Sequence, residues 1–119
     1  MAERLPVDDA TNALVEQVIG AAIEVHRELG GPGLLEEIYE EAFARELELR
    51  AIRYERQCPV PVVYKGHRLI KRYVLDLLIE RRLIVELKAT IEDNPIFRSQ
   101  CLTQLRITNF HLGLVINFG

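Results

Sequence analysis

The chain has 119 residues, of which 49% are hydrophobic and 28% are charged, a composition typical of globular proteins that excludes disordered and fibrous classes. The formal net charge of −3 excludes a protein that is basic throughout, so any contact with nucleic acid must come from a local patch. Apolar runs are interrupted by charge before the roughly 20 residues that a membrane span needs, so no membrane contact is expected.

The start of the chain and its cysteines indicate a cytoplasmic protein. Acidic residues, Asp8 and Asp9, stand where a secretory signal would have an apolar run. Cys58 and Cys101 lie far apart and form no Cys-x-x-Cys or Cys/His cluster, so we expect reduced thiols and no zinc site. The length fits a single domain over residues 1–119.

The first half of the chain predicts two helices. Capping side chains at residues 8–11 precede apolar residues at helical spacing, and the glycines and proline of residues 30–33 should end this first helix. A second helix is expected from about Leu34 to Arg50. Its predicted apolar stripe is Leu35, Ile38, Ala42 and Leu49, with Tyr39, Phe43 and Leu47 alongside and Glu37, Glu40, Glu41, Arg45 and Glu48 in solvent.

The second half predicts strands and one more helix. A β-favouring segment from Tyr54 to Tyr64 contains two prolines, which favours a sheet edge, and Lys65-Gly66 should form a turn. Only residues 80–82 separate the next two strands, so these strands should form an antiparallel hairpin. The remaining expected bounds are Arg68–Ile79 and Leu83–Ala89 for those strands, Ile96–Ile107 for the helix, and His111–Phe118 for a buried last strand. The predicted order is therefore α-α-β-β-β-α-β.

Three charged residues, Asp76, Glu86 and Lys88, lie inside strand sequence that is otherwise apolar. Burying an unpaired charge costs several kcal/mol, so these groups should neutralise one another, bind a cation or face a wet cleft. Alternation puts Glu86 and Lys88 on the same face of their strand. The alternative is an ordinary salt bridge between Glu86 and Lys88, with Asp76 at a solvated sheet edge.

The position of Asp76 depends on the length of the hairpin loop. A two-residue loop would pair Asp76 with Leu87, whereas a three-residue loop, Glu80 to Arg82, pairs Asp76 directly with Glu86. We predict the three-residue loop, because only that register brings two carboxylates within the ~5 Å needed to share a hard metal ion. With Mg²⁺, such a pair would activate water against a phosphodiester, and Lys88 could orient that water or stabilise the transition state.

The segment Gly33-Leu34-Leu35-Glu36-Glu37-Ile38-Tyr39 follows the pattern GxxExxY, and from Asn12 onward nearly the whole chain resembles the GxxExxY protein family. The likeness continues through Pro59–Val62, Asp76–Leu78, Val85–Ala89 and Ile116–Phe118. That family is grouped with the PD-(D/E)XK nucleases. The resemblance implies an α/β (α+β) fold with a restriction-endonuclease-like αβββαβ core, an additional N-terminal helix, and a mixed sheet flanked by helices.

The resemblance also implies a set of site residues. Asp76, Glu86 and the backbone carbonyl of Leu87 would be ligands of Mg²⁺ or Mn²⁺, Lys88 would be the catalytic lysine, and Glu36 would be a helix-borne carboxylate. Tyr39 would follow Glu36 on the same face of its helix and could hydrogen-bond toward the cleft. The alternatives are a carboxylate favoured by the helix dipole for Glu36 and a half-buried core residue for Tyr39.

Gln100 matches a glutamine that precedes a tyrosine by four residues in many of these nucleases, but this chain has Gln104 at the tyrosine position. Gln100 could still contact a metal-bound water or the scissile phosphate. Its alternative is an ordinary surface glutamine on a helix. The departure at Gln104 puts any role of the missing phenol in doubt.

Positive charge is concentrated along the central strands and their turns, at Lys65, His67, Arg68, Lys71, Arg72, Arg81 and Arg82. These residues could contact the phosphates of nucleic acid, or they could protect a sheet edge from aggregation. The sequence thus predicts a metal-dependent nuclease acting on DNA or RNA. The alternative is a non-catalytic nucleic-acid- or protein-binding module that retains the nuclease fold, and a homodimer is a further expectation because one small lobe covers little DNA.

Overall fold

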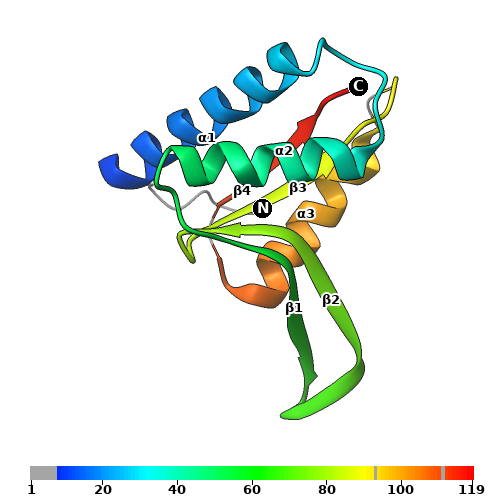
Figure 1. The fold of residues 1–119 in the computed structure, drawn as a ribbon. Coiled ribbons are helices and arrows are strands. Elements are labelled where there is room, and N and C mark those ends of the chain that lie inside the picture. The colour runs from blue at the N-terminus through cyan, green and yellow to red at the C-terminus, as the bar shows by residue number, and fades with distance from the viewer. Residues whose placement is uncertain (1–7, 93, 111) are drawn as a thin grey trace. The chain divides into compact units, whose positions relative to one another are not determined.

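The computed structural model describes residues 8–92, 94–110 and 112–119. Within them, the elements follow the predicted order (Figure 1). Their bounds are α1 Asp9–Glu28, α2 Glu36–Leu49, β1 Tyr54–Tyr64, β2 His67–Ile79, β3 Leu83–Lys88, α3 Pro95–Thr108 and β4 Leu112–Asn117. The four strands form one mixed sheet in the order β1-β2-β3-β4, so the expected α+β fold with its αβββαβ core and additional N-terminal helix is confirmed.

Local side chains explain where the helices begin and end. The Asp8 carboxylate accepts a hydrogen bond from the N–H of Thr11 at 2.7 Å and so caps α1. After α1, the N–H of Gly31 bonds to the carbonyl of His26 at 2.8 Å, and the positive φ of Gly30, 86°, makes this reversal possible. In α3, Asn94 caps the N–H of Ile96 at 3.0 Å and Pro95 occupies the first turn.

The chain divides into two compact units. One comprises the described parts of residues 1–53, 87–93 and 116–119, and the other comprises residues 54–86 and the described parts of 94–115. The single domain expected over residues 1–119 therefore stays a prediction.

In the first unit, an aromatic cluster organises the core. Tyr39 and Phe118 stack with ring centroids 4.7 Å apart and planes 3° apart, and Phe43 meets Phe118 edge-on at 6.4 Å. Small buried residues of α1, Val18, Ala21, Ala22 and Val25, line its inner face. Leu47 completes the buried stripe of α2, because residues four apart share one face of a helix.

The predicted apolar stripe of α2 was wrong. Leu35 is 71% exposed and Ile38 and Leu49 are also exposed, whereas Tyr39, Phe43, Ala44 and Leu47 are buried. Glu40, expected in solvent, is buried as well. Two neighbouring stripes along this helix are apolar, so the sequence pattern allows either stripe to face the core. Packing against Phe118 selects the stripe that carries Tyr39 and Phe43.

In the second unit, a hydrophobic core cluster joins β2 and β3. Leu75, Leu78 and Ile84 are buried together, and Cys58, Val60, Leu105 and Phe110 pack against them. β1 lies at the edge of the sheet, as its two prolines predicted. The last strand, β4, is half-buried and not buried as expected, since it occupies the other edge, and His111 lies outside the described residues.

Candidate active site

The hairpin of β2 and β3 sets the position of the two acidic residues. Leu77 pairs with Val85, Leu78 with Ile84 and Ile79 with Leu83, so Asp76 lies opposite Glu86. The loop is the predicted three-residue connection of residues 80–82, closed by a 3.0 Å bond from the N–H of Arg82 to the carbonyl of Ile79. The predicted register is confirmed.

The two carboxyl groups interact directly. The backbone N–H of Asp76 donates to Glu86 Oε1 at 3.3 Å, and the side chains of these residues share a hydrogen bond as well. Glu86 is only 7% exposed. The pKa of Glu86 is raised from 4.5 to about 7, mainly by burial and further by the negative charge of Asp76. At neutral pH the pair therefore holds a proton or requires a cation in its place.

Gln104 is a third member of this cluster and the residue that sequence analysis missed. It lies on α3, is 4% exposed, and donates a side-chain hydrogen bond to the Glu86 carboxylate. Its other polar atom, Oε1, has no hydrogen-bond partner among the described residues, although it is buried. An unsatisfied buried acceptor costs roughly 1–3 kcal/mol, so this oxygen is suited to a ligand.

The sequence did contain a signal for Gln104. Cys101 and Gln104 are three residues apart, so they share one face of α3, and both are buried. Burial, with the charge of Glu86 as a second cause, raises the pKa of the Cys101 thiol, which places this helix face against Glu86. Gln100, the predicted site glutamine, is exposed on α3, and its proposed role stays a prediction.

Gln57 of β1 adds an unusual backbone conformation beside Asp76. The neighbouring pairs are Arg56 with Leu77 and Cys58 with Leu75, so Gln57 lies across from Asp76. Its φ is 47°, in the left-handed region that non-glycine residues seldom adopt inside a strand. Strained backbone of this kind is often found at functional sites.

The other predicted site residues lie in the first unit. Lys88 ends β3 and is half-buried, two positions after Glu86, and Leu87 is buried between them. Glu36 is exposed and begins α2. The roles predicted for these three residues remain predictions.

Tyr39 has a clear structural position. Its side chain is fully buried, its hydroxyl donates to the carbonyl of Gly31 at 2.7 Å, and the same oxygen accepts from the N–H of Leu34 at 3.2 Å. Both bonds fix the loop that leads into α2. The alternative interpretation of Tyr39 as a core residue thus agrees with its contacts, and its catalytic role stays a prediction.

The cluster fits a divalent cation by the chemistry of its donors. No group of three or more His, Cys, Asp or Glu side chains lies together in the part of the chain that the structure describes. Asp76, Glu86 and Gln104 Oε1 nevertheless provide three oxygen donors, and two of them are mutually repelling carboxylates. Hard cations such as Mg²⁺ and Mn²⁺ prefer such oxygen ligands.

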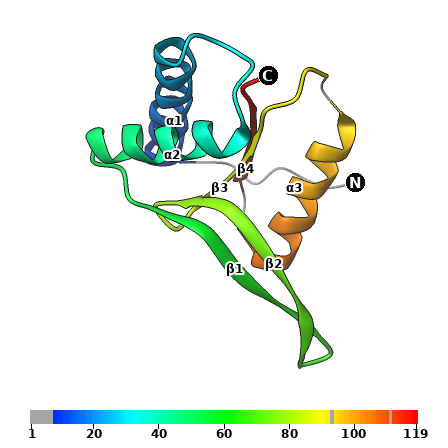
Figure 2. The same cartoon turned by 45° about the vertical axis from the view of Figure 1, so that its right-hand side comes forward.

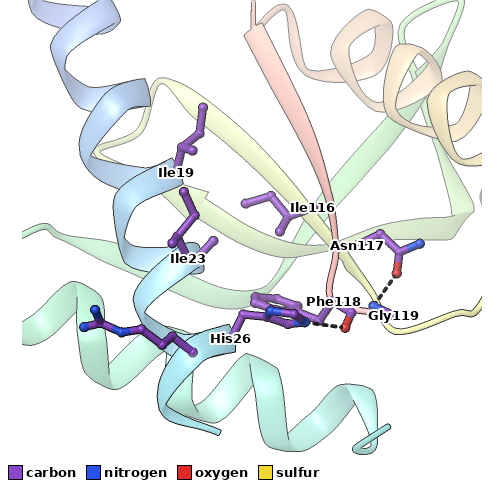
Figure 3. A pocket seen from close by; sticks show the side chains of 9 residues that line it. Ile19, Ile23, His26, Ile116, Asn117, Phe118 and Gly119 are labelled. Carbon is purple, nitrogen blue, oxygen red and sulfur yellow. Dashed lines mark hydrogen bonds between the residues drawn. The ribbon is translucent and has the colours of Figure 1, made fainter. Parts of the chain in front are cut away.

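A separate hollow of about 540 Å³ lies between α1 and the end of β4 (Figure 3). Figure 3 shows Ile19 and Ile23 of α1 beside Ile116, and His26 Nε2 lies 3.2 Å from the carbonyl oxygen of Phe118. His26 is therefore the hydrogen-bonded packing residue that its position near an apolar stripe suggests. The residues that line this hollow include no Asp or Glu side chain.

Comparisons with known proteins bear on the whole chain. None of the described helices is long and apolar enough to cross a membrane. Neither the curated proteins nor the solved structures contain a match to this sequence. A family model described as the PD-(D/E)XK nuclease superfamily matches residues 12–119. Because this match spans nearly the entire chain and the fold has the expected αβββαβ core, the protein belongs to the PD-(D/E)XK nuclease superfamily.

Proposed function

We propose that this protein is a metal-dependent nuclease that hydrolyses phosphodiester bonds of DNA or RNA. The observation that carries the proposal is the acid pair Asp76 and Glu86, held opposite each other on a hairpin, with the pKa of Glu86 raised to about 7. Nucleases of this superfamily generally use divalent metals. A buried pair of carboxyls beside an unpaired amide oxygen suits that use.

Asp76 and Glu86 would hold Mg²⁺ or Mn²⁺ through their carboxylate oxygens, with Gln104 Oε1 as a third donor and the Leu87 carbonyl as a fourth. The bound ion would supply Lewis-acid chemistry for phosphodiester hydrolysis. Gln104 also donates to Glu86, which holds that carboxylate in one orientation. Lys88 follows Glu86 by two positions in a strand, so alternation directs both to the same side, where its ammonium group would orient water or stabilise developing charge.

Three further residues complete the proposed site. Glu36 would add a carboxylate from the first turn of α2, and Tyr39 would position it by holding the preceding loop through Gly31 and Leu34. Gln100 would reach a scissile phosphate from the exposed side of α3. The Gly33–Tyr39 segment follows the pattern GxxExxY, and we propose membership in the GxxExxY branch on the basis of that pattern.

The test is cleavage of labelled single- and double-stranded DNA and RNA with Mg²⁺, with Mn²⁺ and with chelator. Cleavage is expected only with metal and should fall at least about 100-fold in Asp76→Asn and in Lys88→Ala, by analogy with the loss of one preorganised charged group. Glu41→Gln removes an exposed carboxylate of α2 and serves as the control. Cutting that persists in chelator, or that survives Lys88→Ala, would exclude the assignment.

Metal binding supplies a second readout that does not depend on activity. Mn²⁺ should raise the melting temperature of the wild-type protein, and Gln104→Leu should reduce that shift, whereas Gln100→Leu should leave it unchanged. Equal shifts in both variants would remove Gln104 from the ligand set.

The second candidate is a binding module that keeps the fold without cleavage. The departure at Gln104, where related nucleases often have tyrosine, favours it. Retention on nucleic acid that decreases with salt, without cleavage under any metal condition, would support this candidate. A cytoplasmic location and a homodimer remain predictions from the sequence.

A further inference from the structure

The distal part of the hairpin formed by β1 and β2 is a two-stranded ribbon. β2 pairs with β3 from Leu77 to Ile79, whereas its pairing with β1 extends as far as His67. Figures 1 and 2 both show the two strands continuing together to the turn at Lys65 and Gly66. We call residues 60–74 the distal ribbon.

The distal ribbon is basic in an acidic protein. It carries Lys65, His67, Arg68, Lys71 and Arg72, all of them exposed, and no Asp or Glu occurs between Val60 and Leu75. The chain as a whole has 18 acidic and 15 basic residues apart from histidine. Protection of a sheet edge often uses Lys but does not require that acids be absent, so it does not by itself account for the absence of Asp and Glu here.

The distal ribbon also exposes apolar side chains. Ile70 is fully exposed, and Val63, Tyr64, Leu69 and Val74 are exposed as well. The Lys65 ammonium lies 5.6 Å from the centroid of the Tyr64 ring. Edge protection would favour charged residues at such positions, whereas a surface that contacts sugar, base edges or thymine methyl groups needs apolar ones.

The geometry of the distal ribbon favours one partner. Two paired strands are about 5 Å apart, and the major groove of B-form DNA, about 12 Å wide, admits such a ribbon. The major groove of an RNA duplex is too deep and narrow for it.

The ribbon is continuous with the proposed metal site. Arg72 and Val74 alternate along β2 and pair in register with Pro61 and Pro59, so they share one face, and Asp76 follows two positions after Val74. Four residues of strand cover about 14 Å, which corresponds to roughly four nucleotides along the DNA axis. An arginine at this distance from Asp76 can contact the DNA strand whose phosphate lies at Asp76.

We propose that the distal ribbon binds in the major groove of double-stranded DNA, with its arginines and lysines on phosphates and Ile70 against the base edges. This inference rests on the proposed nuclease function and extends it by naming duplex DNA as the substrate class.

The test measures binding of a 20-base-pair DNA duplex by fluorescence anisotropy, in the Asp76→Asn background so that no cleavage interferes. The ribbon variant Arg68→Ala/Lys71→Ala/Arg72→Ala should lose about two orders of magnitude in affinity at 0.1 M salt, and the slope of log K against log salt should fall by about 3. The control variant Arg27→Ala/Arg45→Ala/Arg98→Ala has the same net charge as the ribbon variant and removes three exposed arginines from the helices. It should keep the wild-type affinity and the wild-type salt slope.

A second variant separates shape from charge. Ile70→Ser should weaken duplex binding without changing the salt slope, because it leaves every phosphate contact in place. Circular dichroism melts verify that each variant is folded. Equal losses in the ribbon and control variants, or equally tight binding of duplex RNA of the same sequence, would overturn the inference.

The outcomes also distinguish this inference from the proposed function. If the ribbon binds DNA and no metal condition yields cleavage, the nuclease proposal fails and the inference stands. If metal-dependent cleavage occurs and the ribbon variant binds and cuts DNA as well as the control does, the inference fails and the nuclease proposal stands.

Discussion

Glu86→Gln should flatten the dependence of stability on pH in the metal-free protein. Burial and the neighbouring Asp76 raise the pKa of Glu86 from 4.5 to about 7. Between these values the native state keeps a proton that the unfolded state releases, so the free energy of unfolding falls as pH rises from about 4.5 to about 7. Below 4.5 and above 7 this group contributes no further slope.

The magnitude follows from the shift. One pKa unit corresponds to about 1.36 kcal/mol, so the change from 4.5 to about 7 corresponds to about 3 kcal/mol. Glu86 is 7% exposed, so solvent screening removes little of this value. The wild-type protein should therefore lose about 3 kcal/mol more than Glu86→Gln between pH 4 and pH 8.

Urea denaturation followed by circular dichroism, with chelator present, measures this difference at each pH. Glu41→Gln, which changes an exposed carboxylate of α2, should keep the wild-type pH dependence. Addition of Mn²⁺ should restore the stability of the wild type at pH 8, where the cation replaces the missing proton. A wild type and a Glu86→Gln variant with parallel profiles would refute the reasoning about the acid pair.

Two further predictions concern the packing of each unit. Tyr39→Phe removes the hydroxyl that bonds to Gly31 and Leu34, so the free energy of unfolding should fall by about 1–3 kcal/mol. The loop of residues 30–35 should also be cut faster in limited proteolysis. An unchanged free energy of unfolding and an unchanged cleavage rate would mean that these two hydrogen bonds do not stabilise the protein. In Gly113→Ala, the new Cβ would lie 2.5 Å from the Cys101 sulfur, so a loss of about 1–3 kcal/mol is expected in denaturant titrations. Adding Cys101→Ala should recover part of that loss, and a double variant no more stable than the single one would contradict this explanation.

The acid pair could be predicted because it depends on short-range features. The loop of residues 80–82 has only enough chain for a tight hairpin, and strand alternation then sets Asp76 against Glu86. The same holds for the capping of α1 by Asp8 and for the end of that helix at the glycines, which follow from side chains within a few residues.

Gln104 could not be predicted in this way. Gln100 and Gln104 are one helical turn apart and chemically identical, and the spacing of Gln104 from Cys101 does not show by itself which face of α3 is buried. The distinction arises because α3 packs with Cys101 and Gln104 toward Glu86, which brings a buried amide to the carboxylates and leaves Gln100 in solvent. A family motif that assigns the role to Gln100 therefore selects a position that the packing leaves exposed.

The sequence alone determined the order of the elements, the hairpin register and the basic character of the distal ribbon, since propensity, loop length and charge act between residues that are near in the chain. The tertiary structure decided which face of α2 is buried and which glutamine joins the acid pair. Both of those choices depend on partners that lie far away in sequence, Phe118 for α2 and Glu86 for α3, so only the folded chain can make them.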